Sequence, residues 1–95
     1  MGSMSFLPEL KNFLKVNKTI YTVRRYKMPA AVVAVEGIGR YKRLPMGTIE
    51  TKEDLLPYVM QSGFNKVEDW WAKIEYFIPD PKDIKYLYEV KVLDE

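Results

Sequence analysis

The sequence predicts a small α+β domain in which the strands close into a β-barrel and short helices cover one opening. Its 95 residues are enough for one modest hydrophobic core and too few for two. Segments with strand character alternate with segments of helical periodicity. The last predicted strand must return along the chain to pair with earlier strands, which indicates a closed or half-closed sheet.

We expect one domain over residues 4–95. Met1, Gly2 and Ser3 precede a second methionine, a pattern typical of an expression remnant, and are set aside. No apolar run approaches the roughly 18 residues of a membrane span, so we expect no membrane partner. A secretory leader is not recognisable, and the chain has no cysteine, so a cytoplasmic location is expected.

The first third of the chain predicts a helix followed by two strands. Ser5 is a good N-cap for a helix, and the apolar spacing after it fits one helical face. Residues 18–27 are rich in β-branched and aromatic residues and predict a strand. Alternation would place on one side Lys18, Ile20, Thr22, Arg24 and Tyr26. Residues 30–37 predict a buried strand, because small and branched residues follow one another without polar alternation.

Glycine and proline mark the turns in the middle of the chain. Gly37 and Gly39 predict the turn of a hairpin, whose second strand bends or bulges at Pro45 and Gly47. Thr51, with an aspartate three residues later, predicts a capping box at the start of a helix. Pro57 should divide this helix, and Gly63 should end its second part.

The C-terminal third predicts a helix and a closing strand. Asn65 with Glu68 should begin the helix, which carries two adjacent tryptophans about 100° apart. We expect Trp70 in the core and Trp71 at its boundary, where an exposed ring would serve as a stacking platform or a dimer contact. Residues 84–92 alternate in the manner of a strand.

The residue types narrow the chemistry. Histidine and cysteine are absent, which removes imidazole and thiol catalysis, disulfides and the usual zinc ligands. The acids are scattered and the fingerprints of nucleotide cofactors are missing, so neither a metal nor a cofactor is expected. A role other than that of an enzyme is favoured, and any enzyme would be a metal-independent hydrolase.

Positive charge is concentrated in the first half of the chain. Residues 11–43 hold nine of the fifteen lysines and arginines with one acid, whereas 44–95 hold six lysines and eleven acids. The stretch "KTIYTVRRYK" (18–27) interleaves cations with tyrosine and threonine, a pattern suited to phosphates and unpaired bases. A binding cleft is predicted at Lys18, Thr22, Arg24, Arg25, Tyr41, Lys42 and Arg43.

An ordinary structural reading competes with this one. Threonine and tyrosine form strands well, and exposed cations are common at a sheet edge. Arg24 in particular has acids available as partners, namely Glu36, Glu50 and Glu89. The cations would then form a solvated edge with no common ligand.

The order of several segments resembles the ASCH branch of the PUA-like superfamily. These segments are "KTIYTVR" after a short helix, a glycine-rich hairpin, "SGFNKVEDWWAKI" and a final "YLYEVKV", which together span Lys15 to Leu93. The resemblance implies a small PUA-like pseudobarrel with a cleft, associated with RNA or modified nucleosides. Thr22 and Arg24 match its T-x-R element.

Two functions follow from the resemblance and the charge pattern. The first is a module that binds RNA or another single-stranded nucleic acid, as a monomer or weak homodimer. The alternative is a small hydrolase of RNA or of a modified nucleoside, similar to an N4-acetylcytidine amidohydrolase or a ribonuclease, with Lys18 and Thr22 as catalytic candidates. Lys18 is displaced by one position from the hydrolase pattern, and Ser62 stands where that branch has its glutamate.

Overall fold

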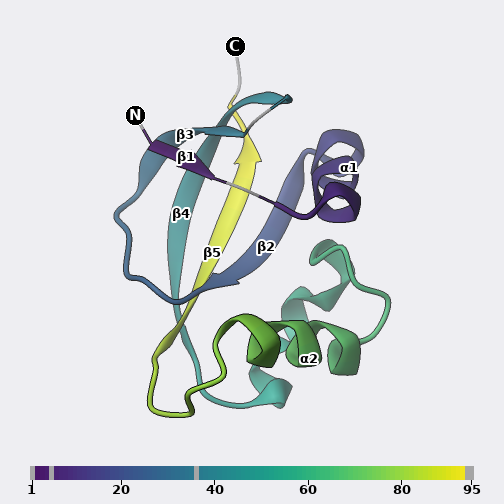
Figure 1. The fold of residues 1–95 in the computed structure, drawn as a ribbon. Helices are drawn as coiled ribbons and strands as arrows, with labels where there is room; N and C mark the ends of the chain where they lie inside the picture. Colours follow the sequence, from purple (N-terminus) through teal and green to yellow (C-terminus); the bar gives the residue numbers. More distant parts are fainter. Residues whose placement is uncertain (1, 5, 36, 94–95) are drawn as a thin grey trace.

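A computed structural model describes residues 2–4, 6–35 and 37–93 of the chain (Figure 1). These residues contain five strands and three short helices. The α+β class is thereby confirmed. In chain order the elements are β1 (Gly2–Met4), α1 (Pro8–Asn17), β2 (Thr19–Arg24), β3 (Ala31–Val35), β4 (Gly39–Ile49), the 3-10 helix η1 (Lys52–Gln61), α2 (Val67–Phe77) and β5 (Lys85–Val92).

The strands form one open sheet in the order β1-β3-β4-β5-β2. The four strands β3, β4, β5 and β2 are antiparallel, and the short β1 pairs in parallel with β3. The predicted barrel is wrong, because the last strand lies inside the sheet. β5 pairs with β4 on one side and with β2 on the other, which leaves β1 and β2 as separate outer strands.

The N-terminal residues take part in this sheet. Gly2 and Ser3, which we expected to lie outside the domain, belong to β1 and pair with Val33 and Ala34 of β3. Met4 follows in the same strand and is buried. Ser5, the predicted N-cap, lies outside the described residues; α1 begins at Pro8, whose missing N–H costs little in a first turn.

The predicted turns and the capping aspartate are present, whereas the helix predicted after residue 51 differs from the expectation. The hairpin of β3 and β4 is present, and the register of β4 shifts between Pro45 and Gly47, as a bulge requires. Asp54 accepts hydrogen bonds from the backbone N–H groups of Glu50 and Thr51, at 3.0 and 3.1 Å. These bonds lower the pKa of the Asp54 carboxyl. Pro57 does not divide the helix that follows, which runs through it as a 3-10 helix.

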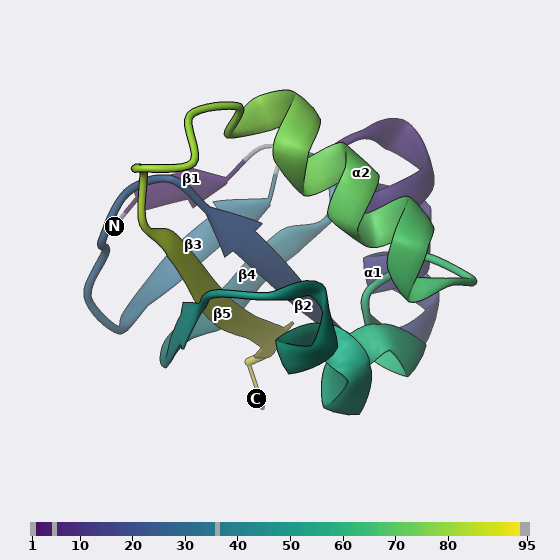
Figure 2. The same cartoon turned by 90° about the horizontal axis from the view of Figure 1, so that it is seen from below.

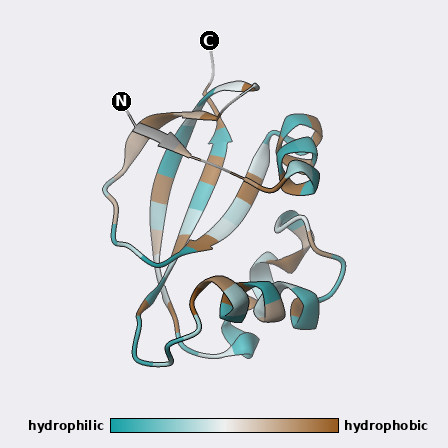
Figure 3. Ribbon diagram, viewed as in Figure 1, coloured by the Kyte–Doolittle hydropathy of each residue, from teal (hydrophilic) through white to brown (hydrophobic). Residues whose placement is uncertain are grey.

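Two hydrophobic clusters lie on opposite faces of the sheet at β5. Side chains alternate between the two faces along a strand, so Val90 belongs to one cluster and Leu87 to the other. Val90 packs with Ile20 of β2 and Leu14 of α1. Leu87 packs with residues of η1 and α2, including Leu55 and Trp70. Both the strands and the helices carry a mixture of hydrophobic and hydrophilic residues (Figure 3).

The helices gather on the β2 side of the sheet, as two perpendicular views show (Figures 1 and 2). Gly63, in the loop between η1 and α2, has a positive φ of 87° and faces α1. A Cβ at this position would lie 2.5 Å from Cδ2 of Leu10, so the loop and α1 are in direct contact. Among the described residues, no helix is long and apolar enough to cross a membrane.

Candidate functional site

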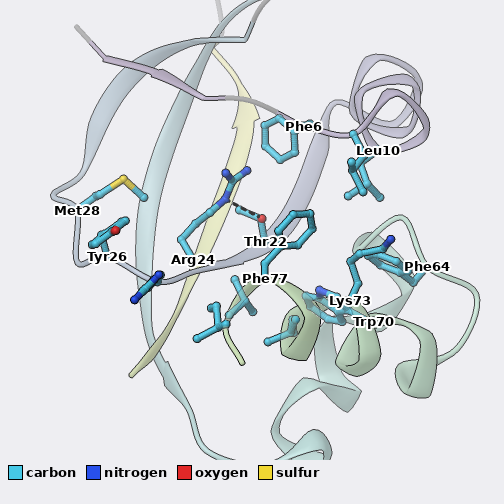
Figure 4. A pocket seen from close by; sticks show the side chains of 15 residues that line it. Phe6, Leu10, Thr22, Arg24, Tyr26, Met28, Phe64, Trp70, Lys73 and Phe77 are labelled. Carbon is cyan, nitrogen blue, oxygen red and sulfur yellow. Dashed lines mark hydrogen bonds between the residues drawn. The ribbon is translucent and has the colours of Figure 1, made fainter. Parts of the chain in front are cut away.

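A cavity of about 630 Å³ opens beside the C-terminal end of β2, between the start of α1 and the length of α2 (Figure 4). We call it the aromatic cavity. Thr22 and Arg24 lie near its centre, with Phe6 and Leu10 on one side and α2 on the other. Aliphatic side chains fill much of its wall, and its aromatic and cationic lining residues are Phe6, Tyr26, Phe64, Trp70, Phe77, Arg24, Arg25 and Lys73.

Arg24 carries a partly buried positive charge in the cavity wall. Its Nε donates a hydrogen bond to Thr22 Oγ1 at 3.2 Å, because the two residues share one face of β2. Its guanidinium lies 4.8 Å from the centre of the Phe6 ring. Burial, and then the positive charge of Arg43, lower the pKa of Arg24.

The segment 25–30, which follows β2, forms one wall of the cavity. Hydrogen bonds with two buried side chains, Tyr88 and Arg43, hold its backbone in place. The buried Tyr88 hydroxyl donates to the Tyr26 carbonyl at 2.8 Å and accepts from the Met28 N–H at 2.6 Å. Arg43, only 7% exposed, donates from Nε and Nη2 to the Pro29 carbonyl at 3.1 and 3.0 Å. These bonds position Arg25 and Tyr26 at the cavity.

Arg25 is the more accessible arginine. Its Nε lies 3.3 Å from Oδ2 of Asp83, and about half of its side chain is exposed. The guanidinium carbon lies 5.8 Å from the Tyr26 ring centre. Because β2 ends at Arg24, the chain turns there, and consecutive residues reach the same cavity.

The opposite wall depends on a serine turn. Ser62 Oγ donates to the Val59 carbonyl at 2.6 Å and accepts from the Phe64 N–H at 3.1 Å. Phe64 is thereby held parallel to Trp70, with ring centres 6.4 Å apart at 11°. Ser62, which stands where the resemblance would place a glutamate, positions an aromatic wall.

The tryptophan prediction is confirmed. Trp70 is buried, whereas Trp71 is half-buried and lies 5.6 Å from the ammonium nitrogen of Lys85. A stacking or dimer role for the face around Trp71 stays a prediction.

A second depression of about 460 Å³ lies near the other end of β2. We call it the basic hollow. It is lined by Lys15, Lys18, Gly37, Ile38, Gly39, Arg40, Tyr41, Val92 and Leu93. Lys18 ends α1 with a positive φ of 67° instead of opening the strand, which begins at Thr19. Tyr41 is buried at the base, and burial raises its pKa.

The seven predicted site residues therefore occupy four places. Thr22, Arg24 and Arg25 meet in the aromatic cavity. Lys18 and Tyr41 line the basic hollow. Lys42 is exposed on the face of β4 opposite to its neighbours, and Arg43 is buried beneath segment 25–30.

The predicted site did not include six of the aromatic and cationic side chains that line the aromatic cavity: Phe6, Tyr26, Phe64, Trp70, Lys73 and Phe77. Phe6 and Phe77 fall at apolar positions with helical spacing, a pattern that core residues produce as well. Phe77 is 54% exposed, although its ring points into the cavity (Figure 4). The available signal was its place next to Tyr76, since two adjacent aromatics cannot both face the core of one helix.

The structure separates the two catalytic candidates. Lys18 and Thr22 lie four residues apart, about 13 Å along an extended chain, and line different depressions. Glu89 lies on the opposite face from Thr22 and accepts a 2.8 Å hydrogen bond from the Tyr21 hydroxyl, which raises the pKa of Tyr21. Glu36 lies outside the described residues. Within the described residues, no acid lines the aromatic cavity, and none of their acids group as a metal site would require.

The chain matches no model of a known protein family, no curated protein and no solved structure. The likeness to ASCH domains stays a prediction from the order of the motifs, and the open sheet departs from the pseudobarrel that it implied. The function is therefore inferred from the geometry of the aromatic cavity.

Proposed function

We propose that this chain is a binding module for RNA or another single-stranded nucleic acid. In this proposal an unpaired base enters the aromatic cavity, and its phosphate contacts the cations of the wall. The observation that carries the proposal is the meeting of five aromatic rings with two arginines and a lysine around one cavity. A relation to the ASCH domains and a cytoplasmic location belong to the same proposal.

Size and lining both fit such a ligand. A cavity of about 630 Å³ lies inside the range of roughly 300–1,000 Å³ that is usual for small-molecule sites. Aromatic side chains stack on bases of every type, with about 1–3 kcal/mol for each base that stacks. Phe77 is the best candidate for such a contact, because it is half-exposed and points inward.

The charges favour the phosphate over a neutral ligand. Burial lowers the pKa of Arg24, and the positive charge of Arg43 adds a smaller contribution. Arginine offers two parallel N–H groups to a phosphate, whereas lysine supplies a point charge. Arg25 and Lys73 bring one cation of each kind to the cavity wall.

A titration of short single-stranded RNA at low salt tests the proposal. Phe77→Ala should weaken binding by about fivefold to 150-fold, because removal of one stacking ring costs about 1–3 kcal/mol. Tyr76→Ala is the matched control: Tyr76 is adjacent, 73% exposed and not part of the cavity lining. Tryptophan fluorescence, to which Trp70 in the wall contributes, provides the readout. Equal losses for the two variants would contradict the proposal.

The cations are tested by their salt dependence. Arg25→Ala with Lys73→Ala should reduce the slope of log affinity against log salt by about 0.7 for each phosphate that the variant no longer neutralises. Lys42→Ala with Lys66→Ala removes the same charge from exposed positions outside the cavity and should leave the slope nearly unchanged. An absence of RNA binding at low salt would end the proposal.

A further inference from the structure

The two depressions are connected by one side of α1. Leu7, the N-cap of this helix, and Leu10 line the aromatic cavity. Lys15 and Lys18, at the other end of the helix, line the basic hollow. The helix rises about 1.5 Å for each residue, so Leu7 and Lys18 are about 16 Å apart along its axis.

A row of lysines covers this side. Leu7, Lys11 and Lys15 follow one another at intervals of four residues, and Lys18 continues the row three residues later, so all four occupy neighbouring positions on the helix surface. Lys15 and Lys18 are exposed, and Lys11 is partly exposed. Among the described residues, none of the three lysines takes part in an ion pair.

The acid of α1 is kept away from the row. Glu9 lies two residues before Lys11 and therefore about 160° around the helix from Lys11. Beyond Lys18, the row is continued by Arg40, which lies in the same hollow beside the Gly37–Gly39 turn. Glycines there leave room for the close approach of a backbone, since nothing lies within 4 Å of a Cβ added at either one.

We propose that a nucleic-acid strand anchored in the aromatic cavity continues along Lys11, Lys15 and Lys18 and ends in the basic hollow. This inference rests on the proposed function. The row offers evenly spaced point charges without aromatic rings, which suits a phosphate backbone and not its bases. The cavity would therefore hold a base, while the row and the hollow carry the phosphates that follow it.

The experiment compares ligands of increasing length. The probes are adenosine and uridine 5′-monophosphates and single-stranded RNAs of up to about eight nucleotides, within the range of sites on single-strand-binding domains. The variant is Lys15→Ala with Lys18→Gly. Glycine is chosen because Lys18 has a positive φ, so the change removes the charge without strain.

For the wild-type protein, affinity should rise with length. The variant should bind the longest RNA tenfold or more weakly, lose about 1.4 from the salt slope, and bind the monophosphates as the wild type does. The control Lys42→Ala with Lys66→Ala carries the same change of charge and should lose less than about twofold.

Each other outcome identifies what failed. If RNA binds and Phe77→Ala weakens it, while the lysine variant matches its control, the path along α1 is wrong and the cavity proposal stands. If neither the monophosphates nor RNA bind, both proposals fall. If a polyglutamate peptide binds as tightly as RNA and loses affinity equally in the lysine variant, the row is a general anion surface and the inference is overturned.

Discussion

The aromatic cavity and the basic hollow lie at opposite ends of the same strand and are built by different means. Buried hydrogen bonds from Tyr88 and Arg43 and the stacked pair Phe64 and Trp70 fix the cavity walls. Exposed cations and a glycine turn form much of the hollow. A fixed wall selects ligands by shape, whereas exposed cations attract any anion and are screened by salt. The cavity should therefore provide selectivity and the hollow mainly charge.

The largest difference is expected between two arginines of β4. Arg43→Ala should lower the free energy of unfolding by about 3 kcal/mol, because it leaves the Pro29 carbonyl without its donors and opens a void. Arg40→Ala, at an exposed position of the hollow, should change it by less than about 0.5 kcal/mol. Urea denaturation measures both. Similar losses would show that the cavity wall is no more tightly built than the hollow.

Two glycines give a smaller contrast. Gly63→Ala should cost about 2 kcal/mol, since it adds a clash with Leu10 to the strain of a positive φ. Gly37 in the basic hollow has a similar φ of 79° with open space around it, so Gly37→Ala should cost only about 1 kcal/mol. Thermal melting compares the two. Equal melting temperatures for the two variants would show that the close contact between the loop and α1 adds no destabilisation of its own.

The smallest effect concerns the alkaline limb of stability. Burial raises the pKa of Tyr41 above its usual value of about 10, so the folded state favours the neutral phenol. The resulting stability is intact below about pH 10 and is lost as the pH rises through the folded pKa. Tyr41→Phe should flatten this decline in unfolding titrations. Tyr76→Phe, at an exposed ring, controls for the loss of a phenol, and an equal change in both variants would contradict a special environment for Tyr41.

Local signals in the sequence were sufficient for most of the secondary structure. Gly37 and Gly39 marked the hairpin, Pro45 and Gly47 the bulge, and Trp70 the buried side of α2. These features depend on a few adjacent residues, so their physical cause is present in the sequence itself. They fixed the course of the chain well enough to bring Thr22 and Arg24 to one cavity.

Features that depend on distant partners were not predictable in this way. The order of the strands is set by the insertion of β5 between β4 and β2, which periodicity does not encode. Lys18 was assigned to a strand because its neighbours are strand formers, yet α1 extends to Asn17 and places Lys18 at its end. Arg43 was expected in the binding cleft, but its partner, the Pro29 carbonyl, is a backbone group that no residue type reveals.

The position of α1 has a mechanical consequence. One short rod forms part of the wall of both depressions, with Leu10 near one end and Lys15 and Lys18 near the other. Gly63 contacts α1 at Leu10 and limits how far the helix can approach the loop, because there is no space for even a methyl group between them. Because α1 contributes to both walls, any change in its position would alter the two depressions together.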